Sequence, residues 1–502
     1  MATTRRKVLK GMLAAGVGGG AAGLLPVGRG AASVREFSTS LRIPALDTGR
    51  LQDNVRTFDL ATQVGKMEFL PGRLTPTIGV NGAFLGPLLR FHAGEAVAIN
   101  VKNQLPFDTT LHWHGLHVPA KADGGPHQVV TQGTTWSPRF EIKQKAGLFW
   151  YHSHLMEHTG EQVNLGLAGP IIIDDEESTA LGLPSEYGVD DIPLVIQDRR
   201  FRADGRFDYL SAMPDMMMGF KGNVILVNGT VSPYFDVRRK RTRLRLLNGS
   251  NSRIYNIGLS DGRPVTQIAS DGSLLEKPVQ RKTVRLGPGE RAEILIDLDA
   301  NSTTTLTSNP DKIAGGMMMG MAGNSETFPI LQLRSGAASG GISPLPARLI
   351  QVPNWDPAKA NRRRSFRLDM GMMGMMGGRG GMMGRGGMGG GMTINGKAMD
   401  IERIDERVHL GAIEIWTVQN PTPLAHPFHI HAIQFRILDR NGAPPLPHEL
   451  GLKDTVLVDP GESVRIITRF DDYADAERPY MYHCHILEHE DAGMMGQFIV
   501  TA

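Results

Sequence analysis

The only cysteine of the chain, Cys484, lies between two histidines, His483 and His485. Successive side chains of a strand point to opposite faces, so we expect Cys484 on one face and the two imidazoles on the other. One strand can thus serve two metal sites, which the short backbone through Cys484 joins. His489 and Met494 follow closely enough for the chain to turn back toward the sulfur. A thiolate, imidazoles and a weak thioether are the ligands of a blue-copper electron-transfer site.

Three further clusters also contain a His-x-His pair, which on a strand points both imidazoles to the same face. The four pairs supply more imidazoles than one or two metal ions need, and they suit about three coppers. A buried cysteine with scattered surface histidines explains one such motif, but not four. The pairs are His112 and His114, His152 and His154, His429 and His431, and His483 and His485.

Strands must position these clusters, because most apolar segments are short and alternate with period two. Examples are residues 96–102, 243–247 and 414–418, and Gly and Pro turns bound them. An Asn-Gly pair recurs at Asn81, Asn228 and Asn395, at domain-sized intervals of 147 and 167 residues. A second short repeat is the sequence Pro-Gly-Glu, which ends both residues 287–290 and residues 459–462 and in each case precedes an apolar strand. We therefore predict three consecutive β-sandwich domains, over residues 40–178, 188–340 and 350–502.

The positions of the histidines in the sequence agree with this division into three domains. All 16 lie within residues 92–158 or 409–489, so the middle domain offers no imidazole. A metal centre must then be built by the first and third domains, which have to meet each other across the fold.

With these four clusters the chain resembles the multicopper oxidases, the family that includes laccases and bacterial periplasmic cuprous oxidases. The resemblance implies an all-β fold of three cupredoxin-like Greek-key β-sandwich domains, and four coppers. By position, it implies a type 1 copper on His426, Cys484, His489 and axial Met494, a type 2 copper on His112 and His429, and a type 3 pair on His114, His152 and His485 and on His154, His431 and His483. Asp123 and Glu490 match acidic residues that assist proton delivery; the alternative is that they are surface carboxylates.

The resemblance also implies a catalytic cycle. A donor gives one electron at a time to the type 1 copper, and Cys484 with its flanking histidines carries each electron to the trinuclear cluster. After four steps O₂ has become two waters. Splitting the sites keeps the donor near the surface and oxygen in a closed pocket.

The electron donor is suggested by methionine. Residues 370–392 consist mainly of Met and Gly, and smaller Met groups lie at residues 213–218 and 317–321. Thioethers favour Cu(I), and the long segment resembles the Met-rich insert of cuprous oxidases; a low-complexity linker is the alternative. Those enzymes bind substrate copper through an Asp and a Met where this chain has Thr422 and Leu424. The possible substrate ligands here are Asp369, Met370, Met372 and Met373.

We therefore predict oxidation of Cu(I) for copper tolerance. One alternative is a laccase that oxidises phenols. Another, of a different class, is a periplasmic protein that binds or sequesters copper without turnover. The implied partners are O₂ and a one-electron donor, either Cu(I) or a phenol.

The N-terminus indicates export. Residues 1–32 carry five Lys or Arg and no acid, and Arg5-Arg6 precedes a Gly/Ala-rich run. This resembles a signal read by the twin-arginine export machinery, with a basic tail as the alternative. The run is too short for a stable membrane span. We expect a periplasmic monomer with no membrane span in its mature form. A formal charge of only +3 argues against nucleic acid as a partner.

Overall fold

A computed structural model of the chain describes residues 37–311, 327–371 and 391–502. These residues belong to one compact unit, residues 36–502. The predicted signal at residues 1–32, the Met group at residues 317–321 and most of the Met/Gly-rich segment lie outside the described residues. Within the described ranges, no helix is both long enough and apolar enough to cross a membrane.

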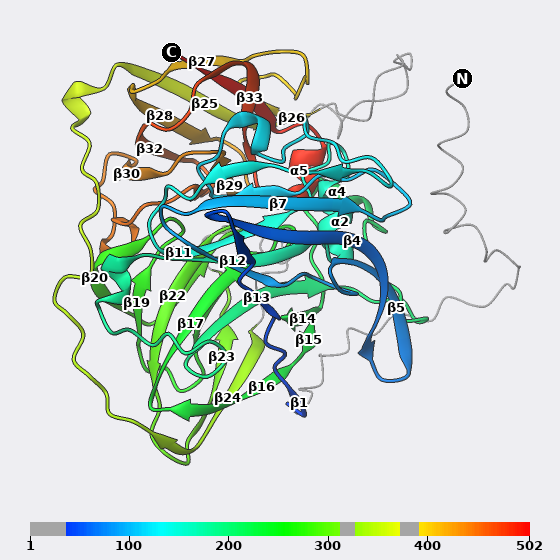
Figure 1. Ribbon diagram of the computed structural model, residues 1–502, viewed down its shortest axis with the longest axis vertical. Helices are drawn as coiled ribbons and strands as arrows, with labels where there is room; N and C mark the ends of the chain where they lie inside the picture. Colours follow the sequence, from blue (N-terminus) through cyan, green and yellow to red (C-terminus); the bar gives the residue numbers. More distant parts are fainter. Residues whose placement is uncertain (1–36, 312–326, 372–390) are drawn as a thin grey trace, which may run out of the picture. The chain divides into compact units, whose positions relative to one another are not determined.

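The described residues form six sheets, which pack as three pairs (Figure 1). Each sheet mixes parallel and antiparallel pairs: two sheets contain two parallel pairs, and each of the other four contains one. This nearly all-β arrangement of cupredoxin-like sandwiches confirms the predicted fold class. The boundaries 40–178, 188–340 and 350–502 stay a prediction.

The first sandwich packs the sheet ordered β10-β7-β4-β3, with β5 and β9 at its sides, against the sheet ordered β2-β6-β12-β11-β8. Its core joins Ile99 and Val101 of one sheet to Phe149 and Ile171 of the other. The strands are β2 (Leu46–Asp47), β3 (Arg50–Gln52), β4 (Val55–Leu70), β5 (Arg73–Val80), β6 (Leu88–His92), β7 (Ala96–Asn103), β8 (His112–His114), β9 (Thr135–Trp136), β10 (Arg139–Glu141), β11 (Gly147–His152) and β12 (Ala168–Asp174).

The second sandwich packs the sheet β1-β16-β24-β23-β18-β21 against the sheet β15-β14-β13-β17-β22-β19-β20. Its core includes Leu244 and Leu246 on one side and Ile257 and Leu331 on the other. The strands are β1 (Thr39–Ser40), β13 (Asp191–Arg199), β14 (Val224–Val227), β15 (Thr230–Val231), β16 (Pro233–Arg239), β17 (Arg241–Asn248), β18 (Tyr255–Leu259), β19 (Val265–Ala269), β20 (Leu274–Arg281), β21 (Val284–Leu286), β22 (Arg291–Asp297), β23 (Thr303–Ser308) and β24 (Phe328–Ser339).

The third sandwich packs the sheet β26-β25-β28-β32-β30 against the sheet β27-β34-β33-β29-β31. Val418 and Ile466 face Phe428 and Phe498 in its core, which also contains Cys484. The strands are β25 (Arg362–Met370), β26 (Met392–Ile394), β27 (Glu406–His409), β28 (Ile413–Asn420), β29 (His426–Ile430), β30 (Phe435–Arg440), β31 (Thr455–Val458), β32 (Glu462–Arg469), β33 (Asp475–Cys484) and β34 (Met495–Thr501).

The Asn-Gly repeat marks the same position in each sandwich. Asn81, Asn228 and Asn395 all have φ near +50°, a conformation that Asn tolerates better than most residues. The side-chain oxygen of each Asn accepts a backbone N–H from one residue of the neighbouring strand. Its side-chain nitrogen donates to the backbone carbonyl that lies two residues earlier in that same strand. The weak sequence repeat is therefore a structural repeat, in which one turn fixes β4, β13 and β25.

Short helices join the sandwiches next to the clusters of histidine. Asp491 of α5 accepts the backbone N–H groups of Thr159 and Gly160 in α2, at 2.9 and 2.8 Å. Figure 1 shows α2, α4 and α5 close together, and α5 contacts both of the others. The helices and 3-10 turns are η1 (Ala120–Ala122), α2 (Thr159–Leu165), α3 (Glu176–Thr179), α4 (Met213–Met218), η2 (Pro357–Lys359), η4 (Pro447–Glu449) and α5 (Leu487–Asp491).

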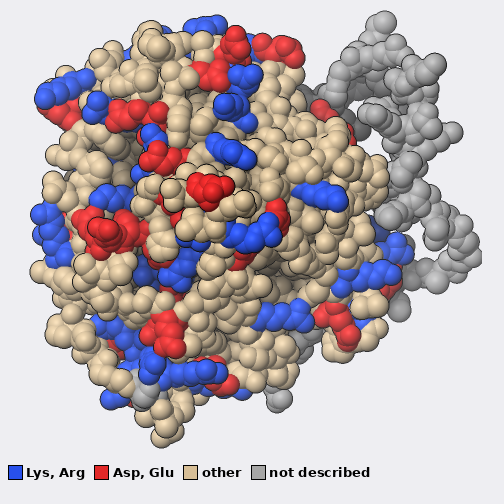
Figure 2. All heavy atoms as spheres, viewed as in Figure 1, with Lys and Arg blue, Asp and Glu red and all other residues tan. Residues whose placement is uncertain are grey.

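On the face shown in Figure 2, Lys and Arg alternate with Asp and Glu over short distances, so neither sign of charge dominates it.

Candidate metal centre

The four His-x-His pairs lie at strand ends, and strand pairing brings them together. His112 lies opposite His152 in the β8–β11 pair, and His429 lies opposite His483 in the β29–β33 pair. Only the first pair lies wholly within a strand. In the others one histidine lies just beyond the end of β11, β29 or β33, yet the two rings of each pair remain close, with centroids 5.1 to 6.1 Å apart.

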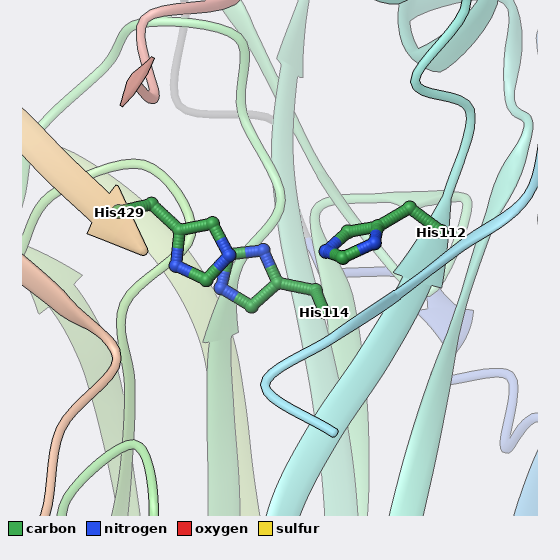
Figure 3. A group of neighbouring side chains, drawn as sticks. All are labelled: His112, His114 and His429. Carbon is green, nitrogen blue, oxygen red and sulfur yellow. The ribbon is translucent and has the colours of Figure 1, made fainter. Parts of the chain in front are cut away.

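Imidazoles from the first and third sandwiches then meet each other. His112 stacks on His431 with ring centroids 3.8 Å apart, and His114 stacks on His429 at 3.7 Å. In Figure 3, His112 and His114 extend from β8 toward His429, which comes from β29. The ring nitrogens form three groups, each with ligand atoms within 4.8 Å of one another: His112, His114 and His429; His114, His152 and His485; and His154, His431 and His483.

Burial lowers the pKa values of seven of these imidazoles, which favours the neutral form and leaves a lone pair for a cation. Burial lowers the pKa of His152 to about 3 and that of His154 to about 4. It lowers the pKa values of His112, His114 and His431 well below the ordinary value. Nitrogens of different histidines lie as close as 3.3 Å. Buried Nε2 atoms of His112, His429 and His485 have no hydrogen-bond partner among the described residues. This donor set suits copper.

The second ring nitrogens are held by oxygen atoms, which fixes the tautomers and ring orientations. Nδ1 of His112 lies 2.8 Å from the carbonyl oxygen of Asp123, and Nδ1 of His429 lies 2.9 Å from that of Asp454. Nε2 of His114 lies 3.0 Å from the Asp454 carboxylate. These contacts leave the opposite nitrogen of each ring to face the centre of its group.

Asp454 is a site residue that sequence reasoning missed. Its carboxylate is fully buried and accepts two hydrogen bonds from the equally buried Arg291 of β22, at 2.6 and 2.7 Å. The guanidinium lowers the pKa of Asp454 well below its ordinary value, against the effect of burial. A charged residue directly before the apolar strand β31 was the available signal. The middle sandwich, which has no histidine, thus supports the cluster through Arg291.

Asp123 and Glu490 both lie against the imidazoles, so neither is a surface carboxylate. Oδ2 of Asp123 lies 2.8 Å from Nδ1 of His431, and burial raises its pKa well above the ordinary value. The Glu490 oxygens lie 3.3 Å from Nδ1 of His154 and 3.1 Å from Nδ1 of His483. Burial opposes ionisation of Glu490, but these two histidines outweigh it and lower the pKa. One carboxyl therefore favours holding a proton and the other favours being charged.

A separate group joins His426, Cys484 and His489. Nδ1 of His426 lies 3.3 Å from Sγ of Cys484 and 3.3 Å from Nδ1 of His489, and Sγ lies 3.9 Å from the latter atom. Burial lowers the pKa of His489 to about 4 and raises that of the Cys484 thiol. A bound cation reverses the second effect, because it favours the thiolate. Met494 is fully buried, and its carbonyl oxygen accepts the Cys484 N–H at 3.0 Å.

The outward nitrogens of this group also have partners. Nε2 of His426 lies 2.8 Å from the hydroxyl of Thr422, and Nε2 of His489 lies 3.0 Å from the carbonyl oxygen of Met217. Thr422 stands where cuprous oxidases have a carboxylate, and here it contacts the histidine. The Met217 contact comes from the middle sandwich, and no pattern in the sequence predicts it.

The predicted substrate ligands are less fully described. Asp369 forms an ion pair with Arg367 at 2.8 Å, and it is absent from the groups of possible metal ligands among the described residues. Met370 lies opposite Met392 in the β25–β26 pair and is partly buried. Met372 and Met373 lie outside the described residues, so this site stays a prediction.

Comparisons with known proteins agree with this geometry. Residues 61–178 and 378–502 match family models described as multicopper oxidase. Multicopper oxidase mco of Staphylococcus aureus is 35% identical over 462 residues, 91% of each chain. Cell division protein FtsP of Edwardsiella tarda is 38% identical over 439 residues, 86% of this chain and 87% of that protein. The solved structure of a laccase-like multi-copper oxidase CueO from Ochrobactrum sp. has a TM-score of 0.82 and 38% identity, covering 92% of this chain and 100% of that one.

The chain is therefore an oxidase that uses copper and O₂. It belongs to the multicopper oxidase family, whose members bind one type 1 copper, one type 2 copper and a type 3 pair.

Proposed function

We propose that the buried groups bind the four coppers. The single observation that carries this assignment is that Cys484 of one group is bonded through the backbone to His483 and His485 of the other groups. The proposed ligands are His426, Cys484, His489 and axial Met494 for type 1, His112 and His429 for type 2, and His114, His152 and His485 with His154, His431 and His483 for the type 3 pair.

When bound, the coppers supply one-electron chemistry at the cysteine and four-electron reduction of O₂ among the imidazoles. The residues supply the route and the protons. His483 Nδ1 lies 3.1 Å from the carbonyl oxygen of Cys484, which offers a second path beside the covalent one. Asp123, which favours holding a proton, and Glu490, which favours the charged form and can accept one, lie at the Nδ1 atoms of different histidines of the cluster. Complete burial of the imidazoles excludes bulk water.

Replacing the cysteine tests the assignment. Cys484→Ser should abolish the intense visible thiolate-to-copper absorption and oxidase turnover, because the hydroxyl is a poor copper ligand. The cluster of imidazoles should keep its copper, since Ser leaves His483 and His485 in place. Absorption spectra and metal analysis check both points. A variant that keeps the blue band would show that the sulfur ligand is assigned wrongly.

We propose that the substrate is Cu(I), oxidised for copper tolerance after export through the twin-arginine machinery. The carbonyl oxygen of Met217, in the methionine-rich helix α4, lies 3.0 Å from Nε2 of His489 in the proposed type 1 site, and thioethers favour Cu(I). Oxygen uptake with Cu(I), Fe(II) and a phenol, compared side by side, tests the substrate. A monomeric periplasmic state stays part of the proposal.

The Met/Gly-rich segment tests the same proposal. Deleting residues 370–392 should lower Cu(I) oxidation and leave phenol oxidation unchanged or raised, because the deletion removes a run of thioethers, which favour Cu(I). Loss of neither activity would assign the segment as a plain linker.

A laccase is the second candidate, since the similar structure from Ochrobactrum sp. is described as laccase-like, with activity toward lignin model compounds. A faster reaction with phenol than with Cu(I) would favour it. A copper-storing protein without turnover is disfavoured by the complete set of imidazoles, and oxygen uptake on adding Cu(I) decides the point. Similarity to FtsP raises a role in cell division, but the ligand groups favour oxidase chemistry here.

A further inference from the structure

We propose that residues 209–220, here called the strap, decide which electron donors reach His489, and that Glu488 is the positioning residue that holds the strap in place. The strap contains α4 and belongs to the middle sandwich. The proposal rests on the type 1 assignment above and names the donor that this cover admits: a small soft cation, Cu(I), rather than a phenol.

The strap covers the outward edge of His489. The imidazole is fully buried, and its Nδ1 faces His426 and Cys484. Its Nε2 lies 3.0 Å from the carbonyl oxygen of Met217. An organic donor that is to contact this ring edge must therefore displace Met217. His426 offers no other entrance, because Thr422, which is only 7% exposed, covers its outward nitrogen.

Glu488 fastens both ends of the strap. The Tyr209 hydroxyl donates to Oε1 at 2.9 Å, and the Phe220 backbone N–H donates to Oε2 at 3.0 Å. The side-chain amide of Asn251 donates to Oε1 at 2.8 Å. Because Glu488 directly precedes His489 in α5, the helix that carries the proposed ligand also carries the residue that fastens its cover.

A second set of contacts fixes α4 within the strap. Asp215 accepts from the Arg200 guanidinium at 2.6 Å and from the Ala212 N–H at 3.2 Å. Gly219 has φ +77°, and a Cβ built there would lie 2.8 Å from Cγ2 of Ile486. At Gly219 the strap therefore lies directly against Ile486, the residue that precedes α5.

The outer side of the strap presents sulfur. Met216 is 48% exposed, and Met217 and Met218 are partly buried. An electron delivered at α4 is one hydrogen bond away from His489, through the Met217 carbonyl. A Cu(I) ion can bind thioethers there and give up its electron without entering the protein. A planar phenol gains no such ligands and is kept from the imidazole edge.

The test uses the copper-loaded full chain and two sets of variants. The tether variant combines Tyr209→Phe, which removes the hydrogen bond to Glu488, with Asp215→Ala, which removes the contacts to Arg200 and Ala212. Neither substitution changes a proposed ligand. Met216→Leu combined with Met218→Leu keeps the shape of α4 and removes two sulfurs. Asp204→Asn is the matched control, because this carboxylate lies on the same stretch of chain but pairs only with Arg206 at the surface.

We expect faster hydrogen exchange of the strap amides in the tether variant, and phenol kcat/KM raised about 10-fold relative to that for Cu(I). The sulfur variant should lose about 10-fold in Cu(I) kcat/KM and keep its phenol value. The control should match the wild type. The proposal is overturned if strap exchange does not change, or if it quickens while the donor ratio stays within twofold of the wild type.

The visible thiolate-to-copper band distinguishes a wrong type 1 assignment from a wrong role for the strap. If the wild-type holoenzyme lacks the band, the type 1 assignment is wrong and the strap has nothing to cover. If the band is present in the wild type and both variants and the donor ratios are unchanged, only the role of the strap is refuted.

Discussion

Removing the Asp454 carboxylate should weaken both the fold and the binding of copper. In Asp454→Ala the Arg291 guanidinium, which is fully buried, loses its ion-pair partner. Removing one member of a buried pair typically costs about 3 to 5 kcal/mol. His114 loses the acceptor 3.0 Å from its Nε2, and loss of such a partner lowers metal affinity about 10- to 100-fold.

The control is another ion pair between the second and third sandwiches. Arg285 contacts Asp459 at 2.7 Å, but both side chains are about one-fifth exposed, with relative side-chain exposures of 22% and 18%. Asp459→Ala should therefore cost only about 1 kcal/mol and should not alter copper binding, because no histidine contacts Asp459 among the described residues.

The assay is copper content after dialysis against a graded series of chelator concentrations, with urea unfolding measured on the same samples. Asp454→Ala should release copper from the imidazole groups at lower chelator concentration, while the cysteine band persists longer. Equal copper retention in Asp454→Ala and Asp459→Ala would refute the idea that Arg291 supports the cluster through Asp454.

Further predictions concern protons and turns. Glu490→Gln should slow oxygen uptake about 10²-fold and keep the blue band, because the amide near His483, unlike the charged carboxylate, cannot accept a proton and pass it on; unchanged uptake excludes this role. Burial raises the pKa of Asp191, but Arg245 lowers it further, to a net value below the ordinary one. This pair therefore stabilises the fold above about pH 4 and is lost as the pH falls through the lowered pKa, so Asp191→Asn should flatten the pH dependence of urea unfolding in that acid range. Asn228→Ala should cost about 2 kcal/mol in the same assay, and Asn228→Gly less, because Gly adopts φ +49° without strain; equal costs would contradict the argument from φ.

The ligand clusters were predictable because each is local in sequence. A His-x-His pair on a strand fixes which side chains share a face, and the absence of histidine between His158 and His409 fixes which sandwiches must meet. The structure confirms that these imidazoles converge. The Asn-Gly turns were equally predictable from the sequence, since a single Asn at positive φ determines each turn.

The contacts behind the ligands were not predictable, because they join residues far apart in sequence. His114 and Asp454 are 340 positions apart, and His489 and Met217 are 272 apart. Strand register and the packing of the sandwiches determine these contacts, and no local sequence pattern indicates them. One local signal was also missed: Glu95 accepts the His92 N–H, just as Glu290 and Glu462 accept from the residue three positions earlier. The turn echo therefore has three copies rather than two.

Every group of possible ligands includes a residue beyond position 425. During synthesis the earlier histidines therefore leave the ribosome well before their partners, and none of the four sites is complete until β29 has docked. Three of the four also need residues 483–489, so full loading with copper must follow folding of nearly the entire chain. Loss of only the last twenty residues would remove His483, Cys484, His485 and His489 together, and with them one ligand or more from three of the four ions.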